Sequence, residues 1–274
     1  MPLFSELNEL MAKYCFRPEH KLAQHFIVNE ALVQRLVSLA ELKEKDIVLE
    51  IGAGTGFLTR ELQKHCKVKA AELDETLFRL LQETLPKQNL ELFHGNFLEI
   101  DAGKYNKVVS LPPYTISSDL IYSILEHGFD IAVLVMQKEF LHKLVAHPGF
   151  FEYGALSVFT QYKCVPELLE TISPNSFFPK PNAFSSIIKL TGKKRFGKAK
   201  DEKIFELFLK QLFRFKNKNL NNALHLSFPF VQKELGLNKK DFERALKKTD
   251  CLEEKVYLLE VKQFVQVFNA ILGK

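Results

Sequence analysis

Short apolar runs alternate with helical patterns along the first two-thirds of the chain. The runs predict strands at IVLEI (47–51), KVKAAEL (67–73), LELF (90–93), KVVSL (107–111) and IAVLVM (131–136). Helices are predicted over 20–41, 57–66, 76–85 and 119–126. Strands that alternate with helices are typical of a parallel sheet covered on both faces. Two late strands, at 158–169 and 185–192, are expected to extend this sheet.

The pattern changes near residue 190. The segment TGKKRFGKAK (191–200) is rich in glycine and lysine and predicts a linker. Beyond it, apolar residues recur at near-helical spacing, first at Ile204, Phe208, Leu212 and Phe215 and again over 261–272. This spacing predicts a small helical bundle. We therefore expect an α/β domain over 1–192 and a helical domain over 193–274.

The composition is that of an ordinary globular protein, with 46% hydrophobic and 26% charged residues among 274. No apolar run approaches the roughly 20 residues of a membrane span, and the acidic N-terminus does not resemble a signal peptide. The four cysteines, Cys15, Cys66, Cys164 and Cys251, are far apart. Their spacing predicts neither a metal site nor a disulfide framework, which favours a cytoplasmic location and no membrane partner.

Charge is distributed unevenly between the two expected domains. Residues 189–274 hold 20 lysines and arginines against 10 acidic residues, whereas residues 1–188 hold 18 against 23. A basic module attracts phosphates, and nucleic acid is the commonest reason for one. The alternative interpretation is a lysine-rich helical surface that is only solvated.

A glycine-rich turn, Glu50 to Gly56, follows the first predicted strand. Alternate glycines allow the backbone to turn tightly beside a ligand. Glu72 stands twenty residues after Gly52, at the end of the second strand, where a carboxylate can accept both hydroxyls of a ribose. The GxGxG spacing favours a nucleoside cofactor without pyrophosphate, with S-adenosylmethionine as the candidate. A glycine turn used only for packing is the alternative.

Two further strand ends carry candidate chemistry. Asn96 follows the third strand, where its amide oxygen can bind the exocyclic amine of an adenine, or where it can simply stabilise the turn. The fourth strand runs into Ser110-Leu111-Pro112-Pro113-Tyr114. Two prolines keep the chain extended, and an aromatic ring beside them can stack on a flipped base. This segment resembles the fourth motif of amino-methyltransferases; a rigid proline turn is the alternative.

Together, these and further motifs resemble the 16S rRNA adenine-N6,N6-dimethyltransferase family, in a form that looks archaeal. The resemblance covers nearly the whole chain. Its matching segments are 23–27 (AQHFI), 50–56, 72–74 (ELD), 137–139 (QKE), 153–158 (YGALSV), 177–181 (FFPKP) and 213–218 (FRFKNK).

The resemblance implies a Rossmann-like class I S-adenosylmethionine-dependent methyltransferase fold with a small all-helical C-terminal domain. It implies dimethylation of N6 on two adjacent adenosines near the 3′ end of 16S rRNA, with a role in small-subunit biogenesis. The expected partner is 16S rRNA in the small subunit or its precursor, and the expected state is a monomer. No metal is expected.

The resemblance also implies roles for individual residues. The expected cofactor-binding residues are His25, Ile27, Gly52, Gly54, Glu72, Leu73, Asn96 and Ser110. The expected catalytic residues are Leu111, Pro112, Tyr114 and Phe178, with Tyr114 and Phe178 on the two faces of the target base. The expected RNA-binding residues are Lys193, Lys194, Arg195, Lys216 and Lys218.

Two departures from the family pattern fall at the expected site. The family has Gly-Asp where this chain has Gly95-Asn96, and it has Asn where this chain has Leu111. Leucine offers no acceptor for the target N6, which leaves the Pro112 carbonyl, unless a shift of the loop lets the Ser110 hydroxyl substitute.

These departures keep two alternatives open. One is an rRNA-binding assembly factor with weak or no methyltransferase activity, and the other is an adenine-N6 methyltransferase for another RNA or for DNA. The glycine spacing disfavours an oxidoreductase.

Overall fold

A computed structural model describes residues 2–192, 196–247 and 249–273. The chain forms two compact units, one of Met1–Leu141 with Pro166–Gly192 and one of His142–Val165 with Lys193–Lys274. These units differ from the division at residue 192 expected from sequence, because 142–165 packs with the C-terminal helices.

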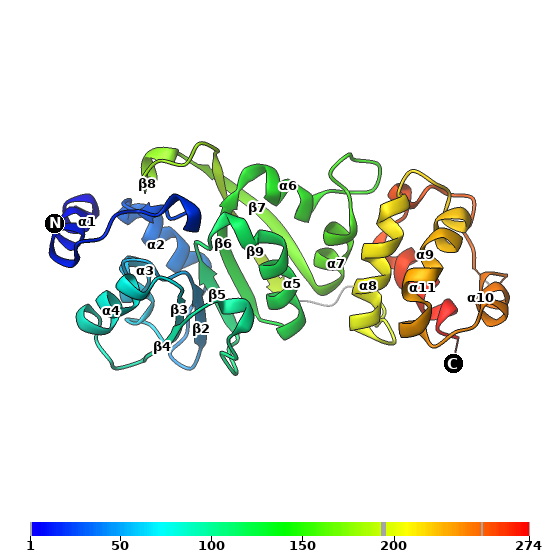
Figure 1. Ribbon diagram of the computed structural model, residues 1–274, viewed down its shortest axis with the longest axis horizontal. Coiled ribbons are helices and arrows are strands. Elements are labelled where there is room, and N and C mark those ends of the chain that lie inside the picture. Colours follow the sequence, from blue (N-terminus) through cyan, green and yellow to red (C-terminus); the bar gives the residue numbers. More distant parts are fainter. Residues whose placement is uncertain (1, 193–195, 248, 274) are drawn as a thin grey trace. The chain divides into compact units, whose positions relative to one another are not determined.

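The first unit is built on a seven-stranded sheet with the order β4-β3-β2-β5-β6-β9-β7 (Figure 1). Its strands are β2 (Ile47–Ile51), β3 (Lys67–Glu72), β4 (Leu90–His94), β5 (Lys107–Ser110), β6 (Ile131–Gln137), β7 (Cys164–Ile172) and β9 (Ser185–Gly192). β2 to β6 are parallel to their neighbours, and β9 runs antiparallel to β6. The predicted parallel sheet is therefore confirmed.

Helices cover the sheet because its strands are apolar on both faces. The covering helices are α2 (Glu30–Leu39), α3 (Phe57–Leu62), α4 (Glu75–Thr84) and α5 (Ser117–His127). α1 (Leu3–Tyr14) contacts two of these helices, since Arg60 of α3 donates to Glu6 and the Tyr14 hydroxyl donates to Glu83 of α4. Alternate strand residues such as Val48, Ala70 and Val133 share one core with the apolar faces of α2, α3 and α4. The strand residues pointing the other way, such as Leu49 and Leu134, are equally buried. This two-sided burial is typical of parallel sheets.

Two predicted elements were wrong. The segment 20–41 is not one helix: it holds a 3₁₀ turn, η1 (His20–Leu22), a short strand, β1 (Phe26–Ile27), and then α2, which Asn29 caps through its side chain. β1 pairs with β8 (Phe177–Phe178) in a separate two-stranded sheet.

The predicted strand over 158–169 is helical in its first part. α7 (Ala155–Lys163) precedes β7, and α6 (Lys138–Val145) was not predicted. The β-branched and aromatic residues of the run 158–163 favour a strand by propensity. In the structure, Val158, Phe159 and Tyr162 are buried at the spacing of one helical face.

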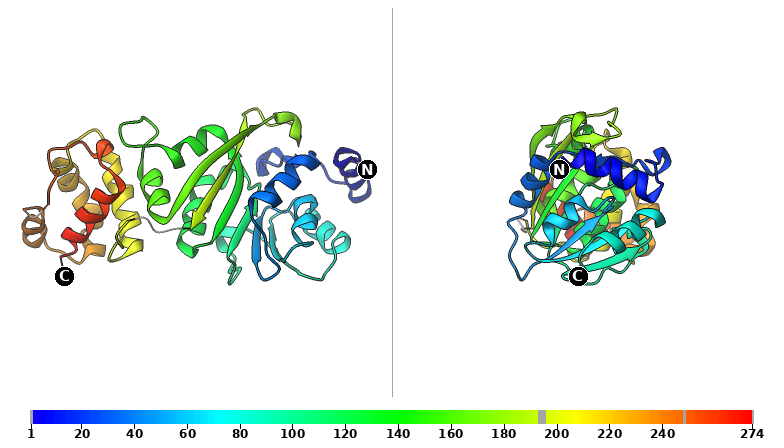
Figure 2. Two further views of the ribbon diagram at one scale, coloured as in Figure 1. Left: turned by 180° about the vertical axis from the view of Figure 1, so that it is seen from behind. Right: turned by 90° about the vertical axis from the view of Figure 1, so that its left-hand side faces the viewer.

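The second unit is a helical bundle, as predicted (Figure 2). Besides α7 it contains α8 (Glu202–Leu212), η5 (Phe213–Phe215), α9 (Leu220–Leu235), α10 (Lys239–Leu246), η6 (Val256–Leu258) and α11 (Val261–Ile271). Its core is aromatic: Phe205 lies 5.1 Å from both Tyr162 and Phe268, measured between ring centroids.

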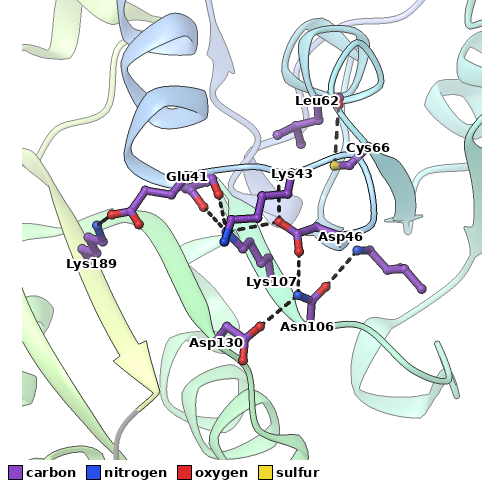
Figure 3. Close-up of polar contacts among 11 residues, drawn as sticks. Glu41, Lys43, Asp46, Leu62, Cys66, Asn106, Lys107, Asp130 and Lys189 are labelled. Atoms are coloured by element: carbon purple, nitrogen blue, oxygen red, sulfur yellow. Dashed lines mark hydrogen bonds and ion pairs between the residues drawn. The ribbon is translucent and has the colours of Figure 1, made fainter.

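A polar network with a buried ion pair joins the amino ends of β2, β5 and β6 (Figure 3). Lys107 Nζ lies 3.2 Å from Asp46 Oδ2 and donates to the carbonyls of Ala40 and Glu41. Asn106 donates to Asp46 and to Asp130. Burial raises the pKa of Asp46, but these hydrogen bonds and that from the Lys43 backbone outweigh it, so the pKa lies below its usual value.

Lys107→Met should lower the free energy of unfolding by about 3–5 kcal/mol, because it leaves the buried Asp46 carboxylate without its cation. The matched control is Lys64→Met, which removes the exposed Lys64–Glu61 ion pair and should cost less than about 1 kcal/mol. Urea unfolding of both variants measures the two costs. Equal costs would contradict a structural role for the buried pair.

Candidate functional site

A pocket opens at the carboxyl ends of β2, β3, β4 and β5, where ligands of parallel sheets generally bind. Each of these strands contributes its following loop. The expected residues that line the pocket are His25, Gly52, Gly54, Glu72, Leu73, Asn96, Leu111, Pro112 and Tyr114. All of them belong to the first unit.

The glycine turn after β2 is tightly enclosed. Gly52 has φ of +78° and Gly54 has φ of +57°, a region that residues with side chains rarely adopt. A Cβ on Gly52 would lie 3.3 Å from Pro113 Cδ, and one on Gly54 would lie 3.3 Å from the Phe26 ring. The turn therefore lies between the Pro-Pro-Tyr loop and β1, and glycine is needed on both sides.

Glu72 ends β3 and is held by the same turn. One carboxylate oxygen accepts from the Gly54 N–H at 2.7 Å, and the other accepts from the Asp74 N–H at 2.9 Å. Burial raises the pKa of Glu72, and these backbone hydrogen bonds limit the rise. Glu72 also lines the pocket, where a carboxylate can accept hydroxyl groups of a ligand.

Glu50 is a second buried carboxyl beside the glycine turn. It lies in β2, and among the described residues its Oε2 atom has no hydrogen-bond partner. Burial, with Glu72 nearby, raises the pKa of Glu50 to about 8. Glu50 is thus mostly protonated at neutral pH, and of the two carboxyl groups only that of Glu72 lines the pocket.

The segment after β4 forms the next wall. Asn96 lines the pocket, but its amide oxygen accepts from the Leu98 N–H at 3.2 Å and its amide nitrogen donates to Glu99 at 3.0 Å. Asn96 therefore stabilises the turn η2 (Phe97–Glu99), which was one of the two roles considered for it from the sequence. Leu73 and Phe97 offer apolar surface here, with Leu73 51% exposed.

The Pro-Pro-Tyr loop forms the opposite wall. The Tyr114 hydroxyl lies 2.6 Å from Ser185 Oγ at the start of β9, and burial raises the pKa of Tyr114. The His25 ring lies 6.0 Å from the Tyr114 ring. His25 Nδ1 lies 2.7 Å from the Pro179 carbonyl, so this nitrogen carries the proton and donates it. Tyr114 and His25 are thus each held by a fixed partner.

Three expected site residues lie outside the pocket. Ser110 is buried, and its hydroxyl donates to the Ile51 carbonyl and accepts from the Ile51 N–H. Ile27 belongs to the hydrophobic core. Phe178 packs edge-on against Phe4, at 5.5 Å between ring centroids.

Of the residues at the site that were not predicted, three bear directly on its chemistry. Phe177, the neighbour of Phe178, lines the pocket in its place, because adjacent strand residues point to opposite faces. Gln24 also lines it and donates to Asp74, which ties the entry segment to the end of β3. Ser185 holds Tyr114. Gln24 and Phe177 both lie inside segments that match the family, 23–27 and 177–181, so the sequence could have indicated both.

The expected RNA-binding residues divide between two regions. Lys193, Lys194 and Arg195 lie outside the described residues. Lys216 and Lys218 follow η5 in the second unit, with Lys218 exposed and Lys216 partly buried. Within the described ranges, no group of three or more histidine, cysteine or acidic side chains is arranged to hold a metal, and no helix is long and apolar enough to cross a membrane.

The pocket fits S-adenosylmethionine by its donors and acceptors. The Glu72 carboxylate can accept the ribose hydroxyls, Leu73 and Phe97 provide apolar surface for the adenine, and the glycine turn leaves room for the methionine part. A side chain on Gly52 would instead meet Pro113.

Comparison with known proteins agrees with this geometry. A family model described as "Ribosomal RNA adenine dimethylase" matches residues 16–269. A protein of Methanothermobacter thermautotrophicus named "Probable ribosomal RNA small subunit methyltransferase A" is 34% identical, covering 98% of this chain and 96% of its own. A Methanopyrus kandleri protein of the same name is 40% identical over 81% of each chain.

Two solved structures are similar over most of the chain. A dimethyladenosine transferase from Plasmodium falciparum has a TM-score of 0.75 and 26% identity, covering 89% of this chain and 96% of its own. The 23S rRNA methyltransferase ErmE has a TM-score of 0.65 and 25% identity, covering 90% and 99%.

Glu50→Gln should stabilise the protein increasingly as the pH rises. The folded pKa of Glu50 is about 8 against a usual value of 4.5, so between these values folding takes up a proton and loses about 1.4 kcal/mol per pH unit. Glutamine does not titrate and avoids this loss. In urea unfolding, the advantage of the variant over the wild type should grow from about pH 5 to about pH 8. A constant difference would mean that Glu50 is ionised in the folded protein.

Proposed function

Because the chain belongs to the ribosomal RNA adenine dimethylase family, we propose that it dimethylates N6 of two adjacent adenosines near the 3′ end of 16S rRNA. Membership makes the protein an S-adenosylmethionine-dependent rRNA adenine dimethyltransferase. The two adenosines, the small-subunit particle and a role in its biogenesis are our inference. The observation that carries it is the contact between the Gly52 turn and Pro113, which joins a nucleoside pocket to a loop suited to an adenine amine.

In this proposal Glu72 and the glycine turn hold the cofactor. Glu72 accepts the ribose hydroxyls, and the backbone at Gly52 and Gly54 borders the methionine part. His25 and Leu73 close the pocket from the entry segment and from the end of β3. When bound, S-adenosylmethionine supplies an electrophilic methyl group on its sulfonium.

The Pro-Pro-Tyr loop orients the target adenine. The N6 lone pair of adenine is delocalised into the ring, so the site must favour a pyramidal nitrogen. The Pro112 carbonyl accepts a hydrogen bond from the N6–H group of the adenine, and this bond directs the nitrogen lone pair toward the methyl group. Tyr114 stacks on the base, with its ring held by Ser185, and Phe177 supplies the second aromatic surface.

Leu111 leaves this arrangement one side-chain acceptor short. Ser110 is a poor substitute, because its hydroxyl is buried and already bonded to the backbone of Ile51 on both its donor and acceptor sides. Asn96 already accepts from Leu98 and donates to Glu99 within its own turn. We therefore propose that Pro112 acts without a side-chain partner and that the chemical step is slow. This feature also supports a second role, that of a factor that binds the particle during assembly.

The partner in this proposal is 16S rRNA in the small subunit or its precursor. Lys216 and Lys218 contribute phosphate contacts from the basic second unit, together with Lys193, Lys194 and Arg195 of the linker. We propose that the protein acts as a cytoplasmic monomer.

Methyl transfer to small-subunit particles that lack the modification tests this function. Tritium from labelled S-adenosylmethionine should enter 16S rRNA. Glu72→Ala should reduce cofactor affinity by at least about tenfold in calorimetry, because charge-assisted bonds to two hydroxyls are lost. The control is Glu44→Ala, an exposed acid in the loop before β2. Unchanged affinity in Glu72→Ala would overturn the cofactor assignment.

Leu111→Asn should raise the rate on these particles by at least about tenfold, or ~1.4 kcal/mol, because it adds an acceptor where the N6 charge changes. The gain should appear in single-turnover rates and leave cofactor affinity unchanged. A fast wild type with a neutral or harmful Leu111→Asn would show that the loop obtains its acceptor from another group.

A further inference from the structure

Two adjacent phenylalanines project from the loop between α6 and α7. Phe150 is 62% exposed and Phe151 is 86% exposed. We call residues 147–152 the Phe150–Phe151 loop. Burial of an aromatic side chain removes about 150–250 Å² of surface from water. Two exposed rings at adjacent positions would therefore gain considerable free energy if a ligand covered them.

The loop is held firmly at its base. Gly149 donates its N–H to the Tyr257 carbonyl at 2.8 Å, and the Tyr153 N–H bonds back to Phe150 at 3.2 Å. Tyr153 is buried, and its hydroxyl donates to the Leu259 carbonyl at 2.9 Å. The fold of the second unit thus presents the two rings to solvent from an anchored backbone.

Cations lie beside exposed aromatic rings of this unit. Lys216 Nζ donates to the Phe151 carbonyl at 2.8 Å and lies 5.0 Å from the centroid of the Phe151 ring. Two residues earlier, the Arg214 guanidinium lies 4.8 Å from the ring of Phe230, which is also exposed. Lysine has three N–H donors, so Lys216 can hold the loop and still contact an anion.

Aromatic rings interleaved with cations match single-stranded nucleic acid. Unpaired bases stack on exposed rings while neighbouring lysines contact the phosphates, and each stacked base contributes about 1–3 kcal/mol. Double-stranded RNA keeps its base faces inside the helix, so the rings select unpaired nucleotides. The excess of 20 basic over 10 acidic residues in 189–274 favours a polyanion over an apolar protein surface.

We propose that the Phe150–Phe151 loop is a stacking platform for unpaired bases of the rRNA substrate, with Lys216 and Lys218 on the adjacent phosphates. This inference deepens the proposed function and rests on it for the identity of the RNA. The platform belongs to the second unit, and it adds contacts to bases in a region otherwise expected to contact phosphates alone.

Binding measurements on the full chain test the platform. The probes are unmodified small-subunit particles, an unstructured 12-nucleotide RNA and a duplex of the same length. Phe151→Ala should weaken binding to the first two by about tenfold, with binding to the duplex unchanged. Phe151→Trp should retain affinity, whereas Phe151→Leu, which keeps apolar surface without a flat ring, should not.

Two controls separate stacking from other effects. Leu226→Ala removes an exposed apolar side chain from α9 and should leave binding unchanged. Lys218→Ala should reduce the slope of log affinity against log salt, whereas Phe151→Ala should lower affinity at an unchanged slope.

Several results would overturn the platform. One is full binding by Phe151→Ala to both the particles and the 12-nucleotide RNA. Another is full binding by Phe151→Leu, which would indicate an apolar protein contact. Self-association of the wild type that Phe151→Ala abolishes would indicate that the loop binds a second copy of the chain.

A different result would overturn the proposed function and still support the platform. It is failure of the wild type to methylate particles, together with binding of the 12-nucleotide RNA that depends on Phe151.

Discussion

The close contact of the glycine turn with its two neighbours sets the geometry of the whole site. A Cβ would lie 3.3 Å from Pro113 at Gly52 and 3.3 Å from the Phe26 ring at Gly54, so both positions leave little space for a side chain. Through these contacts, β1, β2 and the loop after β5 fix one another's positions. The Gly54 N–H in turn fixes the Glu72 carboxylate. The position of this one turn therefore sets both the pocket for a nucleoside and the place of the Pro-Pro-Tyr loop beside that pocket.

The two ends of the parallel strands differ in role: residues at the amino ends stabilise the fold, and residues at the carboxyl ends line the pocket. At the amino ends of the strands, Lys107, Asp46 and Asn106 satisfy one another in a buried network (Figure 3). At the carboxyl ends, Glu50 and Glu72 are buried without a cation, which raises the pKa of both. Burial of carboxyl groups therefore costs free energy at the carboxyl ends of the strands, whereas at the amino ends the buried Asp46 carboxylate has the Lys107 ammonium as its partner.

Much of the fold could be predicted from the sequence because its signals are local. Short apolar runs predicted the parallel strands, and the spacing from Gly52 to Glu72 predicted two residues that line one pocket. The failures depended on tertiary context. The run at 158–163 carries strand-forming residues, but its packing in the second unit makes it helical. Phe177 and Phe178 differ only in the face they present, which a two-residue strand leaves undetermined. The hydroxyl of Ser110 reaches across to β2, a partner 59 residues away in sequence.

The central claim is that this pocket acts on two neighbouring adenosines of 16S rRNA. Mass-spectrometric mapping of 16S rRNA after reaction of the purified protein with unmodified small-subunit particles tests it most directly. The account predicts two adjacent N6,N6-dimethyladenosines near the 3′ end, which form slowly. Methylation confined to another RNA, or to adenines elsewhere in 16S rRNA, would contradict it.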